Sequence, residues 1–290
     1  MNETVRFERV PFSRRLRSML RVDLRRMLRS RLFYIILAVS LLVPLVMTVM
    51  LTMMDGQESK NPQTGEVTVM EGPESVWESF GTLPADPSAP PADAPADGAA
   101  GAMGAMGGMG DMSVMAMCNI NMAFMGVAVF VCLFISEDFR SGYAKNLFTV
   151  RARRGEYVAS KILAGFVCGA LMLLLYALGA ILAGAITGLS FELAGEMSVA
   201  SLVMCLLSKI LLMPVFVSIF TLISVAARQT AWLSICASLG GGMLLFMMIP
   251  MITPLTSTPL HVLLCAAGGA MFALGLGAIG RIILQKTHLV

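Results

Sequence analysis

Long apolar runs separated by charged segments dominate the chain. A helix that crosses about 30 Å of hydrocarbon needs roughly 20 mainly apolar residues. Six runs meet or approach that length, at residues 32–54, 114–135, 162–187, 199–227, 231–249 and 262–284. The pattern therefore predicts an all-α integral membrane protein with six transmembrane helices. Lys209 interrupts the fourth run, and we expect its side chain to snorkel towards the outer interface.

The segment that precedes the first run, residues 1–31, follows a different pattern. Between residues 13 and 30 arginines occupy much of the helix circumference, and one face gathers at helical spacing Leu16, Met19, Leu20, Asp23, Leu24, Met27 and Leu28. This pattern is typical of an amphipathic helix that lies on an anionic cytoplasmic membrane surface. Two interpretations stay open: an anchor that only sets topology, or a membrane-surface helix that also contacts a partner.

Charge is segregated along the chain and indicates its orientation. Residues 1–31 hold ten arginines and three acids, and residues 136–161 hold six basic residues and three acids, whereas residues 55–113 hold one lysine and ten acids. Basic connections tend to stay on the cytoplasmic side of a membrane. We therefore expect both termini, the 136–161 loop and the 285–290 tail to be cytoplasmic, and residues 55–113 to form an extracellular loop.

Composition supports the membrane prediction and adds one candidate chemistry. Hydrophobic residues make up 57% of the chain and charged residues 13%, which is unlike a soluble globular domain. Residues 61–83 of the extracellular loop contain enough Val, Trp and Phe for some local structure, whereas residues 84–111 are rich in Pro, Ala, Gly and Asp and are typical of a disordered linker. Thioether sulfur suits Cu(I), so a copper site is a second interpretation, less favoured than linker composition, for Met103, Met106, Met109, Met112, Met115 and Met117.

The sequence contains no motif for ATP hydrolysis or for another catalytic reaction. The phosphate-binding pattern G-x-x-x-x-G-K-[ST] does not occur, the two histidines are His261 and His288, and no acidic residue lies well inside an expected span. These features disfavour an intramembrane protease, a metalloenzyme and a proton-driven transporter. We therefore expect no catalytic, cofactor-binding or metal-binding residues, and no nucleic-acid partner. Energy for any uphill transport must come from another chain.

The charged loop at residues 136–161 carries the most specific pattern in the sequence. An acidic pair ends the second span, and a basic cluster precedes the third, in the order Glu137, Asp138, Gly142, Lys145, Leu147, Arg151, Arg153, Arg154, Glu156, Tyr157 and Lys161. With the basic amphipathic helix and the six spans, this pattern resembles the ABC-2 type permease family of ATP-binding-cassette transporters. The resemblance covers most of the chain and consists of residue types at approximate spacing.

The resemblance implies that two six-span subunits pair and that each binds a separate ATPase subunit, which holds the ATP and Mg²⁺. Contact would be made by a short coupling helix near residues 142–150, with Tyr143, Leu147 and Phe148 inserted into the ATPase. The arginines would contact the rim of the ATPase groove or lipid phosphates, although they could also serve topology alone. The candidate docking residues are Gly142, Tyr143, Lys145, Leu147, Phe148, Arg151, Arg153, Arg154 and Glu156.

These observations predict a permease subunit of an ATP-driven exporter in a bacterial cytoplasmic membrane. Export is implied by the family alone. The apolar spans favour a hydrophobic or amphipathic substrate such as a peptide, a lipid or a drug-like compound, because their polar groups are few. The alternative is a membrane sensor or scaffold that recruits a cytoplasmic partner without transport.

Overall fold

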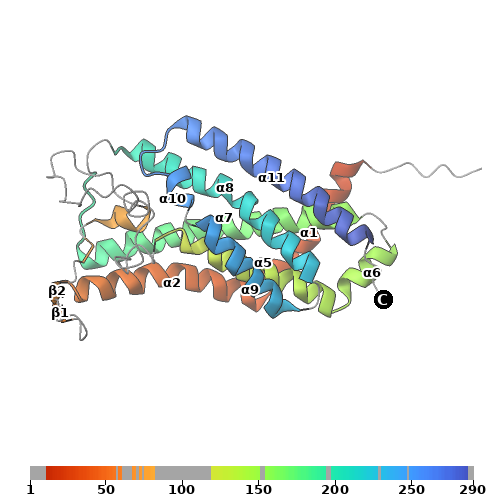
Figure 1. Ribbon diagram of the computed structural model, residues 1–290, viewed down its shortest axis with the longest axis horizontal. Coiled ribbons are helices and arrows are strands. Elements are labelled where there is room, and N and C mark those ends of the chain that lie inside the picture. The colour runs from red at the N-terminus through yellow and green to blue at the C-terminus, as the bar shows by residue number, and fades with distance from the viewer. Residues whose placement is uncertain are drawn as a thin grey trace, which may run out of the picture.

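The structure is a computed structural model, and it describes residues 11–56, 58–60, 67–69, 72–73, 75–81, 119–150, 154–193, 197–227, 230–246 and 248–286. These residues form an elongated bundle of helices (Figure 1). The helices are α1 (Phe12–Arg29), α2 (Arg31–Met53), α5 (Met122–Arg140), α6 (Tyr143–Val150), α7 (Arg154–Thr187), α8 (Val199–Ala227), α9 (Ala231–Phe246), α10 (Ile249–Ile252) and α11 (Pro259–Lys286), with a 3-10 turn, η1 (Val76–Ser79). Two short strands, β1 (Glu58–Lys60) and β2 (Val67–Val69), pair antiparallel with Glu58 opposite Val69.

Five of the described helices, α2, α5, α7, α8 and α11, are long and apolar enough to cross a membrane. The helix α9 has 16 residues, which corresponds to about 24 Å at 1.5 Å per residue. The predicted fifth span, 231–249, thus divides into α9 and the short helix α10, which has Pro250 in its first turn. Proline fits the first turn of a helix, where its missing N–H group is not needed for a helical hydrogen bond, so Pro250 suits the start of α10.

The helix boundaries around the charged loop differ from the sequence prediction. The second long helix begins at Met122 rather than at residue 114 and continues to Arg140, and the third begins at Arg154 rather than at residue 162. The segment expected as one loop, 136–161, therefore comprises the end of α5, the helix α6 and the first turns of α7. Its polar residues stay helical because several of them are paired within the bundle, as described below.

The elements gather at two ends of the bundle, which we name after one element each (Figure 1). The α6 end holds α1, α6, the last turn of α5, the first turn of α7 and the end of α11. The η1 end holds η1, the two strands and α10. Here Val76 packs against Gly184 of α7, and the Trp77 indole donates a 3.3 Å hydrogen bond to the Phe191 carbonyl. Local structure expected within residues 61–83 is therefore confirmed at residues 75–81.

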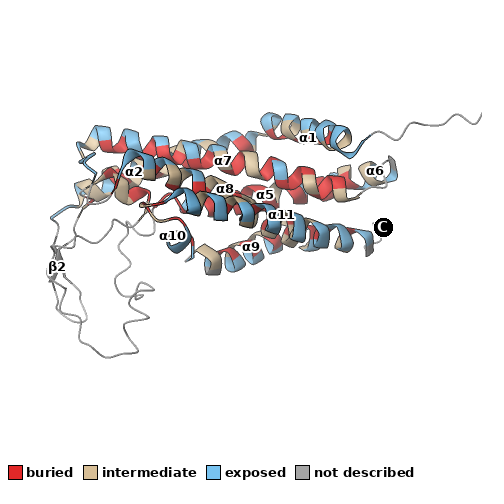
Figure 2. Cartoon of the chain, turned by 90° about the horizontal axis from the view of Figure 1, so that it is seen from above, coloured by how far each residue is buried: buried red, intermediate tan, exposed pale blue. Residues whose placement is uncertain are grey.

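The helix α5 lies between α11 and α2, which form opposite outer sides of the bundle (Figure 1), and the residues of α11 are largely exposed (Figure 2). In the most apolar window of each helix, 61% of the residues are buried in α5, compared with 22% in α2 and 11% in α11. The outer helices keep large apolar side chains exposed, including Leu42, Met50, Leu264 and Phe272. Such a surface suits a hydrocarbon environment rather than water.

Glycines allow the backbones of two helix pairs to approach closely. A Cβ atom at Gly179 of α7 would collide with the Leu41 carbonyl oxygen of α2, and one at Gly269 of α11 would lie 2.5 Å from the Leu211 carbonyl oxygen of α8. Small residues are favoured at such contacts because van der Waals packing, not the hydrophobic effect, drives helix association in lipid. The pairs α2–α7 and α8–α11 therefore depend on these glycines.

Candidate functional site

A network of buried charges joins α1 to α5 and α7 at the α6 end. Asp23 lies on the inner face of α1, Asp138 near the end of α5 and Lys161 in the second turn of α7. Lys161 Nζ lies 2.8 Å from Asp23 Oδ1 and 2.7 Å from Asp138 Oδ2, and all three side chains are fully buried. One ammonium group thus bridges two carboxylates that belong to different helices.

A second cation completes the network. Arg26, one turn after Asp23, places Nη1 2.8 Å from Asp138 Oδ1. The Tyr157 hydroxyl donates a 3.1 Å hydrogen bond to Asp138 Oδ2, and the Ser160 hydroxyl donates to Asp23 Oδ2. Every carboxylate oxygen of Asp23 and Asp138 therefore has a partner. We call Asp23, Arg26, Asp138 and Lys161 the charge network; its two positive and two negative groups balance.

Aromatic rings line the charge network. Lys161 Nζ lies 4.0 Å from the centre of the Phe134 ring, and Arg26 Cζ lies 3.9 Å from the centre of the Tyr143 ring. A cation over a ring face is attracted by the ring quadrupole, the more so where water is excluded. The Arg26–Tyr143 contact connects α1 directly to the start of α6.

The protonation of the groups outside the spans fits this arrangement. Burial lowers the pKa of Arg26, but Asp138, Tyr143 and Asp23 together raise it more, so that the pKa lies above its ordinary value. Burial also raises the pKa of Tyr143 above its ordinary value. Arg26 is therefore a permanent cation at physiological pH, and Tyr143 presents it with a neutral ring.

Further contacts at the α6 end join α7 to α1, α11 and α6. Arg15 of α1 places Nε 3.1 Å from Glu156 Oε1 of α7, and the Glu156 side chain is 5% exposed. Arg154, at the start of α7, donates a hydrogen bond to the carbonyl of Leu284 in α11 and lies over the Phe148 ring at 5.7 Å. Of the predicted docking residues, Glu156 and Arg154 therefore contact the protein's own helices.

The helix α6 has two distinct faces. Tyr143 lies against Arg26, and the Phe148 ring lies 5.3 Å from the Tyr157 ring in an edge-on contact. Leu147 packs against the same core. The opposite face exposes Lys145, Asn146 and Thr149.

The three apolar side chains predicted to insert into an ATPase thus face the bundle, because an eight-residue helix buries its apolar face against the nearest apolar surface. The outward face of α6 is polar instead. Gly142 directly precedes α6 and has a φ of +72°, a left-handed conformation that glycine adopts without steric cost. Arg151 and Arg153, like the six loop methionines considered for copper, lie outside the described residues.

Lys209 behaves differently from the sequence prediction. Its side chain is fully buried in α8, and its ammonium group donates to Asn121 Oδ1 at 2.7 Å and to Thr253 Oγ1 at 3.1 Å. The prediction that it snorkels to the outer interface is wrong. Both acceptors are neutral: Asn121 directly precedes α5, and Thr253 directly follows α10. Within the described part of the chain no carboxylate forms an ion pair with Lys209.

Sequence reasoning missed the charge network, although two signals pointed to it. Asp23 is the one acid on the apolar face of the amphipathic helix, and Lys161 directly precedes a long apolar run. A charged residue on an apolar face requires a buried partner. The sequence does not identify that partner, because Asp23 and Lys161 are 138 positions apart.

A model of the family described as ABC-2 family transporter protein matches residues 98–245, about half of the chain. The chain belongs to the ABC-2 transporter family. The resemblance inferred from the sequence is thereby confirmed, and the protein is a membrane transport permease. Comparisons with curated proteins and with solved structures gave no match.

The part of the chain that matches the ABC-2 family contains α5 to α9, and hence Asp138, Tyr157 and Lys161. Asp23 and Arg26 lie in α1, outside the match. The charge network thus joins the matched segment to the N-terminal helix. Because separating a buried ion pair leaves an uncompensated charge at a cost of about 3–5 kcal/mol, α1 and the ends of α5 and α7 are expected to move together.

Proposed function

We propose that this chain is the membrane-spanning subunit of an ATP-driven exporter, and that a separate ATPase subunit binds the exposed face of α6. Family membership supports a role as a transport permease. The observation that carries the docking proposal is the two-faced helix α6, which exposes Lys145, Asn146 and Thr149 and turns Tyr143 and Phe148 towards the charge network. In this arrangement ATP and Mg²⁺ are bound by the partner chain.

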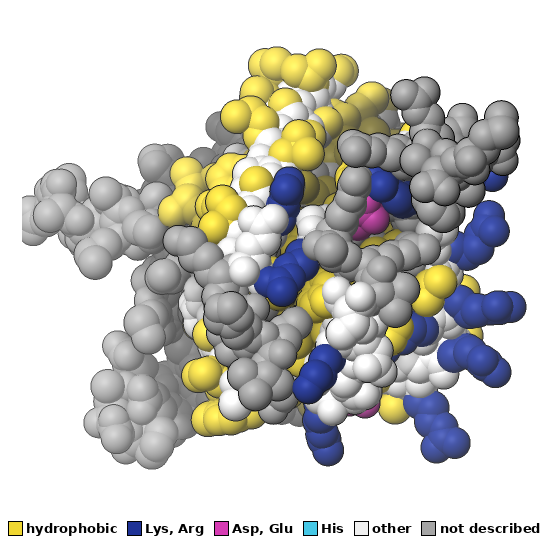
Figure 3. Space-filling view, turned by 90° about the vertical axis from the view of Figure 1, so that its right-hand side faces the viewer, with side chains coloured by type: hydrophobic (Ala, Val, Ile, Leu, Met, Phe, Trp, Pro, Cys, Tyr) yellow, Lys and Arg dark blue, Asp and Glu magenta, His cyan; other side chains and the backbone are white. Residues whose placement is uncertain are grey.

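The proposed orientation puts the α6 end in the cytoplasm. Lys and Arg side chains gather on this end, with few acids visible among them (Figure 3), and such enrichment is typical of a cytoplasmic face. The helices α9 and α10 together form the sixth crossing in this proposal. An even number of crossings agrees with the position of α1 and the end of α11 at the same end of the bundle (Figure 1).

Transport would be coupled to ATP hydrolysis through α6. A displacement of α6 by the ATPase acts on Arg26 through Tyr143 and on Tyr157 through Phe148, since these pairs are in contact. The charge network then carries the displacement to α1, α5 and α7 as one body. Rigid-body motion of packed helices is a common mode of such transitions, because packed cores move between discrete arrangements rather than deforming continuously.

The apolar surfaces of the bundle support a proposal for the substrate class and for a second permease subunit. We propose a hydrophobic or amphipathic substrate, such as a peptide, a lipid or a drug-like compound, moved along the interface of two paired permease subunits in a bacterial cytoplasmic membrane. The exposed apolar faces of α2 and α11 support contact with lipid and with a second subunit.

The docking proposal can be tested with a matched pair of charge reversals. Tagged protein is isolated from native membranes in mild detergent, and the co-purifying ATPase is identified by mass spectrometry and reconstituted with it in nanodiscs. Lys145→Glu reverses an exposed charge on α6, and Glu192→Lys reverses an exposed charge at the η1 end. We expect Lys145→Glu to weaken ATPase binding by on the order of 10-fold, as for an interface charge, and Glu192→Lys to leave it unchanged.

Two outcomes would contradict the proposal. If no ATPase co-purifies with the wild-type protein, the sensor or scaffold interpretation replaces the transporter. If an ATPase binds but both reversals affect it equally, docking does not use the outer face of α6. Correct membrane insertion of both variants is verified first, by protease protection of the two ends of the chain.

A further inference from the structure

The outer face of α1 carries a regular row of cations. Arg17, Arg21, Arg25 and Arg29 recur every four residues and are all exposed. The row extends about 18 Å along the helix at 1.5 Å per residue. Within the described residues none of the four forms an ion pair, in contrast to Arg15 and Arg26 on the inner side of the same helix. We call these four residues the arginine row.

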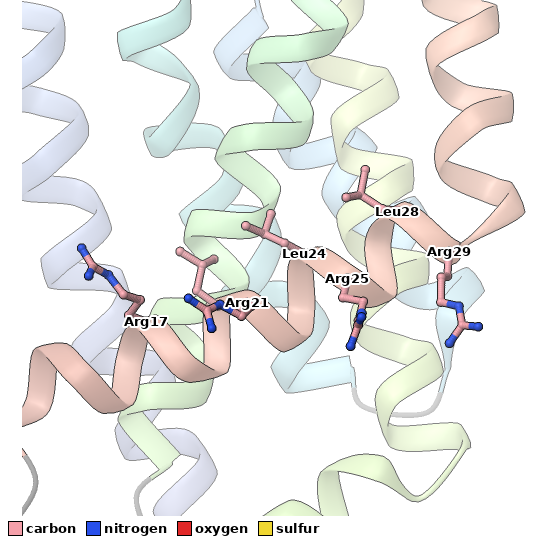
Figure 4. Close-up of a pocket in the computed structure, with 7 residues that line it drawn as sticks. Arg17, Arg21, Leu24, Arg25, Leu28 and Arg29 are labelled. Carbon is pink, nitrogen blue, oxygen red and sulfur yellow. The ribbon is translucent and has the colours of Figure 1, made fainter.

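A row of leucines accompanies the arginine row. Leu20, Leu24 and Leu28 also recur every four residues, and together with the arginine row they line an open hollow of about 880 Å³. Leu24 and Leu28 point from α1 towards the body of the long helices, whereas Arg25 and Arg29 point away from it (Figure 4). Over residues 24–29 the leucines therefore lie on the side of α1 towards the spans and the arginines on the side away from them, whereas Arg17 points to the same side as the leucines (Figure 4).

The attachment of α1 fixes the direction of this face. The inner face is held by the ion pairs of Asp23 and Arg26 and by the burial of Met19 and Met27. Ser30 alone separates α1 from α2, a helix long and apolar enough to span the membrane. These attachments hold the inner face of α1 against the bundle, next to the first residues of α2.

We propose that the arginine row binds the phosphate groups of anionic phospholipids, with the leucine row inserted among their acyl chains. Planar guanidinium groups bind phosphate oxygens in bidentate geometry, and basic residues beside an anionic leaflet gain binding energy from its surface potential. The depth of α1 and the leucine row favour lipid over an acidic soluble protein, since such a protein would leave the leucines in water.

Anionic lipid bound to α1 would also affect α6, because α1 carries residues of the charge network that contacts α6. The residues that hold α1 to the bundle, Asp23 and Arg26, belong to the charge network that contacts α6. Anionic lipid thus stabilises the position of the same network through the opposite face of the helix. Lipid binding itself does not require an ATPase, so it can be tested on the permease alone.

The test measures which lipids the purified protein retains. The full chain is purified in the presence of equal amounts of dioleoyl phosphatidylglycerol and dioleoyl phosphatidylcholine, and native mass spectrometry gives the ratio of the two retained lipids. The variant Arg21→Gln/Arg25→Gln removes two exposed charges from the arginine row. The control Arg140→Gln/Lys145→Gln removes two exposed charges elsewhere at the α6 end.

We expect the wild type to prefer phosphatidylglycerol and Arg21→Gln/Arg25→Gln to lose this preference by roughly 25-fold, because each of the two basic residues near an anionic surface contributes roughly fivefold. The control should keep it, and Arg21→Lys/Arg25→Lys should retain most of it. A wild type without preference, or equal losses in the control and the arginine-row variant, would overturn the proposal. Either result is independent of whether an ATPase binds α6.

Discussion

The charge network makes a quantitative prediction for Lys161→Met. Methionine has a similar stem and can occupy the apolar space beside Phe134, so the substitution removes the ammonium group with little change in packing. Asp138 keeps Arg26 and the Tyr157 hydroxyl, but Asp23 keeps only the Ser160 hydroxyl. The variant therefore contains a buried carboxylate without a cation.

The expected loss follows from the cost of an unpaired buried charge. Removing one partner of a buried ion pair typically costs about 3–5 kcal/mol, and Lys161 bridges two carboxylates, so we expect the upper part of this range. Removing Asp23 as well should restore stability, because the carboxylate is no longer buried without a partner. In Asp23→Leu/Lys161→Met the Ser160 hydroxyl can still donate to the Tyr157 carbonyl, which lies 3.1 Å away. This variant should be at least about 2 kcal/mol more stable than Lys161→Met alone.

Lys209→Met is the matched control. Lys209 and Lys161 are both buried, at 0% and 1% exposure, but the partners of Lys209 are an amide oxygen and a hydroxyl. The loss should be about 1–3 kcal/mol, the cost of leaving a buried polar group unsatisfied. Unfolding is followed by circular dichroism at 222 nm as sodium dodecyl sulfate is titrated into mild detergent micelles.

The reasoning is refuted if Lys161→Met and Lys209→Met destabilise the protein equally. It is also refuted if the effects of Asp23→Leu and Lys161→Met simply add, since residues that form an ion pair must show a coupling energy. Asp23→Leu alone completes the double-mutant cycle.

Three further substitutions, each paired with a comparison variant, are expected to give distinct results in the same titration. Gly179→Leu should cost about 1–3 kcal/mol through overpacking against α2, whereas Gly240→Ala, where an added Cβ meets nothing within 4 Å, should stabilise α9 by about 0.5–1 kcal/mol; equal effects would exclude a close α2–α7 contact. Gly142→Ala should cost about 1–2 kcal/mol because of its left-handed backbone, and Gly142→Asn less, so an unchanged midpoint would contradict the assigned turn. Arg26→Lys should cost about 1 kcal/mol through weaker contact with Tyr143, and Tyr143→Leu should remove the difference between arginine and lysine.

Several elements could be predicted from the sequence because they depend on local pattern. The apolar runs gave the five long helices, and the periodicity of residues 13–30 gave α1, since both signals lie within one segment. Helix ends were less predictable. Asp138 and Glu156 look like loop residues in a linear reading, but each continues a helix because a cation from α1 pairs with it.

The helix α6 was likewise predicted only in part. Its position between two spans and its alternation of apolar and polar residues were visible in the sequence. The direction in which Tyr143, Leu147 and Phe148 point was not, because a helix with one apolar face can bury that face against another protein or against its own bundle. In the structure this face packs against the protein's own bundle, because Tyr143 contacts the Arg26 cation and Phe148 contacts the Tyr157 ring.

The sequence by itself determined that this protein is a multi-helix membrane protein, because hydrocarbon requires long apolar helices and the charge pattern between them is a property of consecutive residues. Only the tertiary structure decided which charges become partners. Asp23, Asp138 and Lys161 come from three helices, and Lys209 finds Asn121 and Thr253 on two other segments. A buried charge is stable only beside a specific partner, and distance along the chain does not reveal which residues will be adjacent once the helices pack.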